Sequence, residues 1–185
     1  MHSVLNLDTA ILAFAAAHRS EILDQLFRGM TWLGSLYVLI PAALALVSLL
    51  AHRQNRFEAW LLGMGLCGTA LMAYTIKRIL ARPRPALYPL LIELPVSDSF
   101  PSAHAAQATA FFLCLVLIVR RQAPEWAGWV ACAALVVVAC VAASRIYLQV
   151  HFPSDTLGGM VLGVLWVTVL YKLMLRRERQ ASLLR

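Results

Sequence analysis

The chain has 185 residues, of which 61% are hydrophobic, and a formal net charge of +7. The hydrophobic share is well above the roughly 45–50% of soluble globular domains, so the composition excludes an ordinary soluble protein and indicates an integral membrane protein. The basic residues cluster at the ends of apolar stretches and form no basic face with interleaved aromatic residues, which argues against a nucleic-acid partner.

The N-terminal stretch, residues 4–30, mixes apolar and charged side chains at three- and four-residue spacings. This pattern predicts an interfacial amphipathic helix or helix pair, and a sixth membrane-embedded helix is the alternative. We divide the chain into this N-terminal unit (1–30), a transmembrane core (31–176) and a basic cytoplasmic tail (177–185).

Five apolar stretches in the core reach the roughly 17–25 residues that a helix needs to cross a bilayer. The predicted fold class is therefore all-α integral membrane, with five transmembrane helices. The stretches are Leu33–Ala51, Ala59–Leu80, Pro101–Val119, Trp126–Ala143 and Thr156–Leu175.

The distribution of Lys and Arg between the loops predicts the orientation. The loops at Arg53 and Arg120 share one side of the membrane with the basic C-terminal segment. The opposite side carries fewer basic residues once Lys77, Arg84 and Arg145 are set aside as site residues. Because Lys and Arg in short loops stay in the cytoplasm, the opposite side should face the periplasm or exterior of a bacterial inner or plasma membrane.

Three polar groupings lie at span ends on that outer side, namely Lys77–Pro85, Ser99–His104 and Ser144–Asp155. A charge at membrane depth costs roughly 2.5–3.5 kcal/mol on insertion scales, so intramembrane charges usually have a functional partner. The shared side predicts that the three groupings form one site.

The residue types in these groupings favour a phosphate ligand. Lys77, Arg84 and Arg145 could neutralise a dianion, and arginine binds phosphate oxygens two at a time. Pro101 and Ser102 begin an apolar helix, whose free N–H groups and positive dipole end attract anions. The Ser102 hydroxyl can add another donor.

Two histidines remain for chemistry. His151 has Asp155 four residues later, and the carboxylate could hold the imidazole in the tautomer that leaves one nitrogen free to attack phosphorus. His104 could protonate the departing oxygen and then activate water.

The chain resembles the type-2 phosphatidic acid phosphatase superfamily of membrane lipid phosphatases over about Leu33–Leu175. The resemblance lies in three motifs that match in order and spacing: Lys77-x6-Arg84-Pro85, Pro101-Ser102-Ala103-His104 and Ser144-Arg145-x5-His151-x3-Asp155. It implies a metal-independent phosphomonoesterase or diphosphatase without a cofactor. It also implies a phosphohistidine intermediate on His151, with Asp155 as orienter and His104 as acid and base. The implied phosphate ligands are Lys77, Arg84, Ser102, Ala103, Ser144 and Arg145.

One position departs from the family pattern, since Ala103 stands where the family usually has glycine. Alanine supplies a helical N–H as well as glycine does, so activity should survive unless the position needs a positive φ. Arg82 is extra to the motifs and is a candidate for binding a second phosphate or the headgroup.

Three alternatives remain open at this point. Ser102, His104 and Asp155 could form a serine-hydrolase triad, although no G-x-S-x-G elbow is present. His104, His151 and Asp155 could bind a metal, although the surrounding cations oppose one. A small transporter or assembly factor is the non-enzymatic alternative, without the inverted repeats that transporters tend to have.

The expected substrate is a lipid whose tail stays in the bilayer, foremost a polyprenyl diphosphate such as undecaprenyl diphosphate of the cell-envelope carrier cycle. Phosphatidylglycerol phosphate, phosphatidate and a lipid A phosphate are alternatives, because the motifs bind only the phosphate that these lipids share. We expect the loop Ala81–Phe100 and the N-terminal helix to select the tail and the headgroup.

Overall fold

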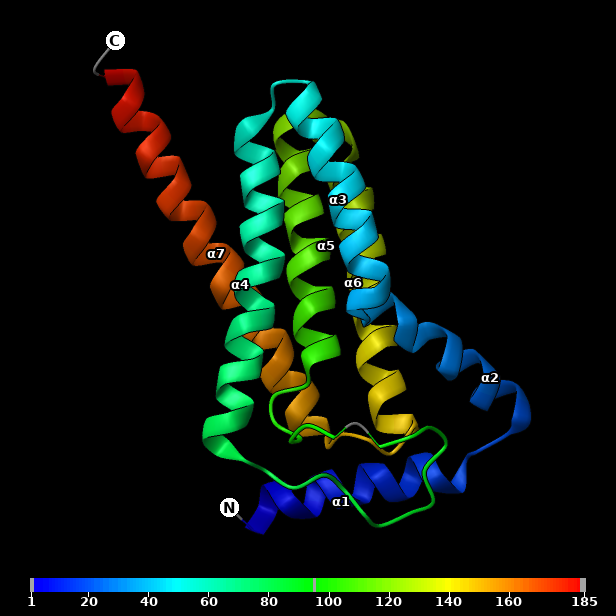
Figure 1. The fold of residues 1–185 in the computed structure, drawn as a ribbon. Coiled ribbons are helices and arrows are strands. Elements are labelled where there is room, and N and C mark those ends of the chain that lie inside the picture. The colour runs from blue at the N-terminus through cyan, green and yellow to red at the C-terminus, as the bar shows by residue number, and fades with distance from the viewer. Residues whose placement is uncertain (1, 95, 184–185) are drawn as a thin grey trace.

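The computed structural model describes residues 2–94 and 96–183, and in this part of the chain all regular secondary structure is helical. Helices α3 to α7 stand side by side around α5, and α1 lies across one end of them (Figure 1). The last two residues of the predicted tail, 184–185, lie outside the described residues. The elements are α1 His2–Ala17, α2 Glu21–Met30, the 3-10 turn η1 Thr31–Gly34, α3 Leu36–His52, α4 Arg56–Leu80, α5 Ala103–Gln122, the 3-10 turn η2 Pro124–Trp126, α6 Ala127–Tyr147 and α7 Pro153–Leu183.

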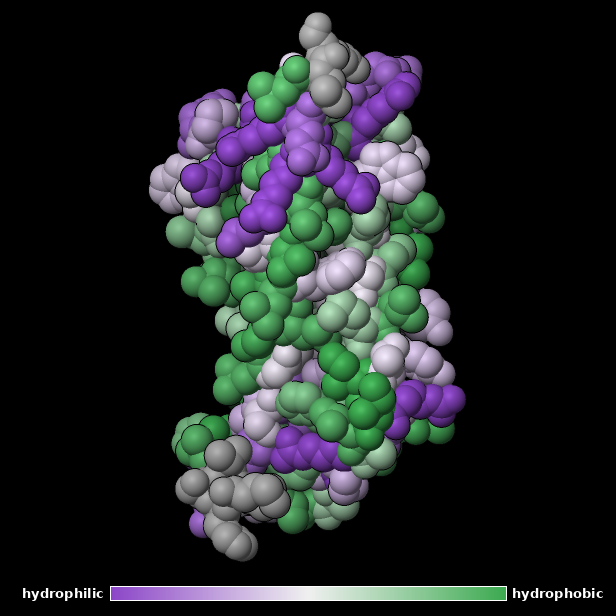
Figure 2. Space-filling view, turned by 90° about the vertical axis from the view of Figure 1, so that its left-hand side faces the viewer, coloured by the Kyte–Doolittle hydropathy of each residue, from purple (hydrophilic) through white to green (hydrophobic). Residues whose placement is uncertain are grey.

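The five predicted spans are confirmed as helices. Four of them, Arg56–Leu80, Ala103–Gln122, Pro124–Tyr147 and Pro153–Leu183, are long and apolar enough to cross a membrane singly. The fifth, Leu36–His52, is long and apolar enough only together with Glu21–Gly34, which meets it at a bend of 44°, as in a broken span or a re-entrant loop. Figure 2 shows the resulting hydrophobic band between two hydrophilic ends.

The N-terminal stretch forms the helix pair that the sequence predicts. Ser20 caps α2, because its hydroxyl accepts a hydrogen bond from the Leu23 amide at 3.3 Å. Figure 1 shows α1 running across the end of the bundle, below the start of α5. Asp8 and Leu12 of α1 are buried, so this helix packs against the bundle as well as bordering it.

Helix α5 is the centre of the bundle and packs against α4, α6 and α7. Glycine allows α7 to approach it closely, as a Cβ at Gly159 would lie 2.4 Å from the Ser102 carbonyl oxygen and one at Gly163 would lie 2.7 Å from that of Ala106. The Ser102 amide donates to the Asp155 carbonyl at 2.9 Å. The two helix N-termini are thereby held together at one end of the molecule.

The long connection between α4 and α5 runs along that same end, beside α1 (Figure 1). It leaves α4 through Ala81, which has a left-handed φ of 43°. The Ser99 amide donates to the Arg82 carbonyl at 2.8 Å and closes the connection into a loop. This loop carries Arg82, Arg84 and Ser99 to the ends of α5 and α7.

Candidate active site

His151 and Asp155 form the centre of the site and are 2% and 0% exposed. The Nδ1 atom of His151 lies 3.4 Å from Oδ2 of Asp155 and 3.5 Å from the Ser99 hydroxyl. On the other side of the ring, Nε2 lies 3.1 Å from Nη1 of Arg84. Arginine can only donate, so Nε2 carries the lone pair and Nδ1 carries the proton.

The surroundings of His151 keep the imidazole neutral. The pKa of His151 is lowered to about 3, first by burial and then by the positive charges of Arg145, Arg84 and Lys77, against the opposing effect of the hydrogen bond to Asp155. A neutral ring with an unprotonated Nε2 is the form that can attack an electrophile. The pKa effects also show that all three cations lie within electrostatic range of the imidazole.

Asp155 is fixed by four donors besides its place at the start of α7. Its Oδ2 accepts from the Ser99 hydroxyl at 2.5 Å and from the Phe152 amide at 2.9 Å, in addition to facing His151. Its Oδ1 accepts from Arg82 at 2.7 Å. These bonds orient the carboxylate and, through it, the imidazole.

Lys77 and Arg84 donate to main-chain carbonyl groups of the long loop and of the segment before His151. Lys77 donates to the carbonyls of Asp98 at 2.5 Å and Ser99 at 3.2 Å. Arg84 donates to the carbonyls of Ser97 at 2.8 Å and Val150 at 2.6 Å. Burial lowers the pKa of Arg84 from its ordinary value, opposed by the negative charge of Asp155. Both cations thus donate to neutral acceptors, and Arg84 also lies against His151.

Two buried hydrogen-bond donors in the site lack a partner, namely Nε of Arg145 and the hydroxyl of Ser102. The Nη1 of Arg145 donates to the Thr31 hydroxyl at 2.6 Å. An unsatisfied buried polar group costs about 1–3 kcal/mol. Ser102 is the N-cap of α5 and Arg145 carries a positive charge, so an anionic ligand is favoured that would satisfy both groups.

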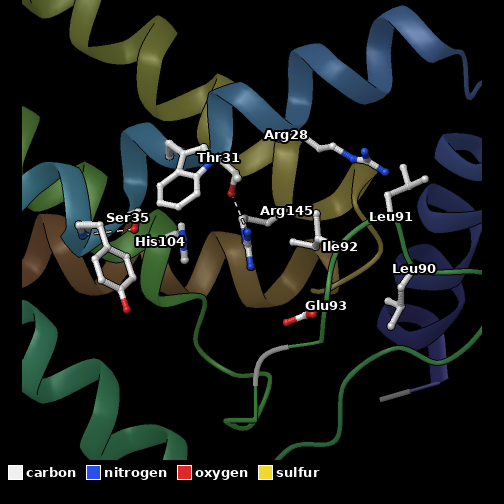
Figure 3. Close-up of a pocket in the computed structure, with 11 residues that line it drawn as sticks. Arg28, Thr31, Ser35, Leu90, Leu91, Ile92, Glu93, His104 and Arg145 are labelled. Carbon is white, nitrogen blue, oxygen red and sulfur yellow. Dashed lines mark hydrogen bonds between the residues drawn. The ribbon is translucent and has the colours of Figure 1, made fainter.

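A cavity of about 1000 Å³ opens beside these residues and is lined by both His104 and Arg145. The two side chains point into the same space (Figure 3), with Arg28 entering from α2 and Glu93 from the long loop. The remaining lining residues are Thr31, Trp32, Ser35, Tyr37, Leu90, Leu91 and Ile92.

The structure also places the motif residues Ala103 and Ser144, and Arg82, which is extra to the motifs. Ala103 is the first residue of α5 and is not among the described residues with positive φ, so the conformation that would have required glycine does not occur. Ser144 donates to the Val141 carbonyl of its own helix at 2.7 Å. Arg82, a candidate for binding a second phosphate or the headgroup, pairs with Asp8 at 3.0 Å and with Asp155 at 2.7 Å.

Four residues of the site carry no motif signal. Asp8, Thr31 and Ser99 bind Arg82, Arg145 and Asp155, respectively. Gln149 has a left-handed φ of 61° in the loop before His151, and its amide donates to the Leu12 carbonyl at 3.0 Å. The only sequence signal for Asp8 is a carboxylate on an otherwise apolar helix.

The geometry also bears on two of the alternatives. The Ser102 hydroxyl has no hydrogen bond to His104, although a nucleophile and its base should be within hydrogen-bond reach. Across residues 2–94 and 96–183, no three His, Cys, Asp or Glu side chains are grouped closely enough to hold a metal ion.

Comparison with known proteins gives a family match. The family model of the PAP2 superfamily matches residues 58–179, about two thirds of the chain. Phosphatidylglycerophosphatase B of Bacillus subtilis is 29% identical over 167 residues, which are 89% of this chain and 81% of the relative. Decaprenylphosphoryl-5-phosphoribose phosphatase of Mycobacterium tuberculosis is 35% identical over 123 residues, which are 65% of this chain and 63% of the relative.

A solved structure, the crystal structure of a transmembrane PAP2-type phosphatidylglycerolphosphate phosphatase from Bacillus subtilis, has the same fold. It superposes with a TM-score of 0.85 at 28% sequence identity. The match covers 96% of this chain and 88% of the solved chain, so it includes the N-terminal helices as well as the motif-bearing core.

Proposed function

This chain belongs to the PAP2 superfamily and is a membrane lipid phosphatase, and we propose that it removes the terminal phosphate from a lipid whose headgroup holds a second phosphate nearer the tail. The observation that carries the proposal is the cavity of about 1000 Å³, which joins His104 and Arg145 to Arg28 and to the surface.

The lining of the cavity supports a substrate with its tail in the bilayer. Trp32 and Tyr37 border it and are 53% and 83% exposed, at the start of the first span. Leu90 and Leu91 of the long loop line it as well. An apolar opening at the side of the bundle lets a lipid headgroup reach the site while its tail stays in hydrocarbon.

The polar groups of the cavity beyond the motifs support a headgroup with two phosphates. Arg28 supplies a cation for an inner phosphate, and Glu93 supplies an acceptor for hydroxyl groups. The two relatives act, by their names, on phosphatidylglycerophosphate and on decaprenylphosphoryl-5-phosphoribose. Both names describe a terminal phosphate on a polyol that a second phosphate joins to the tail.

A polyprenyl diphosphate, the substrate that the sequence favours, is the second candidate. It also has two phosphates, here joined directly, and the relative whose named substrate carries a decaprenyl tail has the higher identity of the two. The two candidates differ in the distance between the terminal and the inner phosphate, and hence in how far the inner phosphate reaches toward Arg28.

The proposed reaction has two steps. The Nε2 atom of His151 forms a bond to the terminal phosphorus as the bond from phosphorus to the lipid oxygen breaks, and His104 protonates that oxygen. His104 then takes a proton from water, whose oxygen attacks the phosphorus, and the bond to Nε2 breaks to release phosphate. Lys77, Arg84 and Arg145 stabilise the phosphoryl oxygens, because charged acceptors bind more strongly than the present carbonyls.

We place this reaction on the extracytoplasmic face. The opposite end of the molecule carries Arg53, Arg120, Arg121 and the basic C-terminal part of α7, and Figure 2 shows hydrophilic side chains gathered at that end. Retention of Lys and Arg in the cytoplasm supports this orientation.

The decisive experiment is phosphate release from a panel of lipids by the purified protein in detergent with excess chelator. We expect turnover of phosphatidylglycerophosphate and of undecaprenyl diphosphate at a higher kcat/KM than of phosphatidate, and no turnover by His151→Ala. Absence of release from every lipid phosphate, or a strict need for an added divalent ion, would contradict the proposal.

The role of Arg28 has its own comparison within this panel. A hydrogen bond to a charged group contributes about 1.5–3 kcal/mol, so Arg28→Ala should lower kcat/KM roughly 10- to 100-fold for lipids with an inner phosphate. Phosphatidate, which has only one phosphate, should be affected little. Arg78→Ala removes an exposed arginine elsewhere and is the matched control. An equal loss on all lipids would contradict the assignment.

A further inference from the structure

A buried carboxylate, that of Asp8, ties helix α1 to the segment 149–155, which contains His151 and Asp155. Asp8 is 3% exposed. Its Oδ1 accepts from the Ser154 amide at 2.9 Å, and its Oδ2 accepts from the Ser154 hydroxyl at 2.5 Å. Ser154 stands immediately before Asp155, so Asp8 fixes the backbone that carries the orienting carboxylate.

The same carboxylate reaches Asp155 through Arg82. Arg82 donates from Nη2 to Asp8 at 3.0 Å, and from Nη1 to Asp155 and to the Ser154 hydroxyl, both at 2.7 Å. Its guanidinium also lies over the Phe152 ring, 4.3 Å from the ring centre. A planar guanidinium held on three sides can transmit the position of one carboxylate to the other.

The network contains one positive charge, on Arg82, and two negative charges, on Asp8 and Asp155. Arg82 alone beside Asp155 would neutralise the carboxylate that must support His151. Asp8 supplies a second negative charge to the same guanidinium, so Asp155 retains negative charge for the imidazole. The Oδ2 of Asp155 that faces His151 is the oxygen that Arg82 does not contact.

We propose that Asp8 is a positioning residue for the reaction, acting through Arg82 and Ser154 to hold Asp155 and hence the His151 imidazole in line with the phosphorus. Asp8 lies outside the family match of residues 58–179, and α1 thereby becomes part of the catalytic apparatus. A second hydrogen bond ties the same helix to the segment 149–155, because the Gln149 side-chain amide donates to the Leu12 carbonyl at 3.0 Å. The inference rests on the proposed role of His151 as nucleophile.

The test compares Asp8→Asn with Asp24→Asn. Asp24 is the matched control, because its carboxylate accepts from the Tyr147 hydroxyl at 2.6 Å and so ties α2 to α6 without contacting Arg82. Misplacement of a reacting group by about 1 Å can cost roughly 100-fold in rate. We therefore expect Asp8→Asn to lower kcat roughly 10- to 100-fold with KM little changed, and Asp24→Asn to keep kcat within about twofold of wild type.

Two inhibitors separate positioning from a general loss of structure. Vanadate resembles the transition state when it accepts a bond from Nε2 of His151, whereas inorganic phosphate only needs the cations. Asp8→Asn should weaken vanadate binding about tenfold or more and leave phosphate binding unchanged. Arg82→Gln should behave alike, and the Asp8→Asn and Arg82→Gln double variant should be no worse than the poorer single variant.

The inference is overturned if Asp8→Asn retains kcat within about twofold of wild type, or if vanadate and phosphate binding weaken in parallel. Should Asp8→Asn not fold, Ser154→Ala tests the same link, with lowered kcat and unchanged phosphate binding expected and a wild-type kcat contradicting it. Inhibitor binding measured by calorimetry needs no lipid. It therefore tests the effect of Asp8 on the site even if the wild-type protein released no phosphate and the proposed function failed.

Discussion

His151 combines deep burial with two contacts of opposite character, Asp155 at Nδ1 and Arg84 at Nε2. Free histidine has a pKa near 6.5, whereas burial and the neighbouring cations lower the pKa of His151 to about 3. The ring therefore remains neutral and nucleophilic across the range in which an exposed histidine becomes charged.

This lowered pKa links His151 to stability. As the pH falls below about 6.5, the unfolded chain binds a proton at residue 151 before the folded chain does, so the free energy of unfolding falls between about pH 6.5 and pH 3. The slope from one group is at most about 1.4 kcal/mol per pH unit. Unfolding of wild type and His151→Gln at pH 7.5 and pH 5 should show a larger loss for wild type. Equal losses would mean that residue 151 does not contribute.

Arg145 needs its fork as well as its charge. It is 2% exposed, with Nη1 bound to Thr31 and Nε free of protein partners. Lysine keeps the charge, but its single nitrogen cannot reproduce the two donors that the guanidinium holds apart, Nη1 toward Thr31 and Nε toward a phosphoryl oxygen. Arg145→Lys should therefore lower kcat/KM about 100-fold in the phosphate-release assay, the scale of one lost transition-state donor. Arg78→Lys on the exposed face of α4 should be without effect, and similar rates for both variants would refute the argument.

At the scale of elements, the junction of α5 and α7 places the site. Both helices begin at the same end of the molecule, and Gly159 lets their backbones approach so that the Ser102 amide reaches the Asp155 carbonyl. Ser102 and His104 thereby come from one helix start and Asp155 from the other. The 3-10 turn η1, between α2 and α3, adds Thr31 and Trp32 to the wall of the cavity.

Gly159→Ala tests this junction. Its Cβ would lie 2.4 Å from the Ser102 carbonyl oxygen, so the helices must separate or shift. Overpacking of this kind costs about 1–3 kcal/mol, and we expect a lower thermal midpoint together with lower kcat. Gly63→Ala is the control, because its Cβ would meet nothing within 4 Å. Matching midpoints for the two variants would show that the close approach is dispensable.

At the scale of the whole molecule, the hydrophobic band in Figure 2 separates an end that holds the cavity from an end rich in arginine. Labelling of single cysteines with a membrane-impermeant thiol reagent in intact cells tests the orientation, after replacement of Cys67, Cys114, Cys132 and Cys140. Ala86→Cys in the loop beside the site should react, and His52→Cys at the opposite end should react only after lysis. The reverse pattern would place the site in the cytoplasm.

The sequence by itself determined the membrane class and the apolar helices of the core, and it predicted the chemistry of the motifs. Span length and hydropathy are local properties, because a bilayer requires every spanning backbone to satisfy its own hydrogen bonds. Motifs that combine histidines with basic residues can likewise be recognised in the sequence. The N-terminal helix pair was also predictable from its spacing, although its place across the bundle end was not.

Only the tertiary structure decided which side chains support the motifs. Arg82 reads as a free cation in the sequence, yet it pairs with Asp8, 74 residues away, and Asp8 binds Ser154, 146 residues away. Such contacts form where separate helices and loops pack together. The periodicity of one helix does not specify which distant residue will contact that helix.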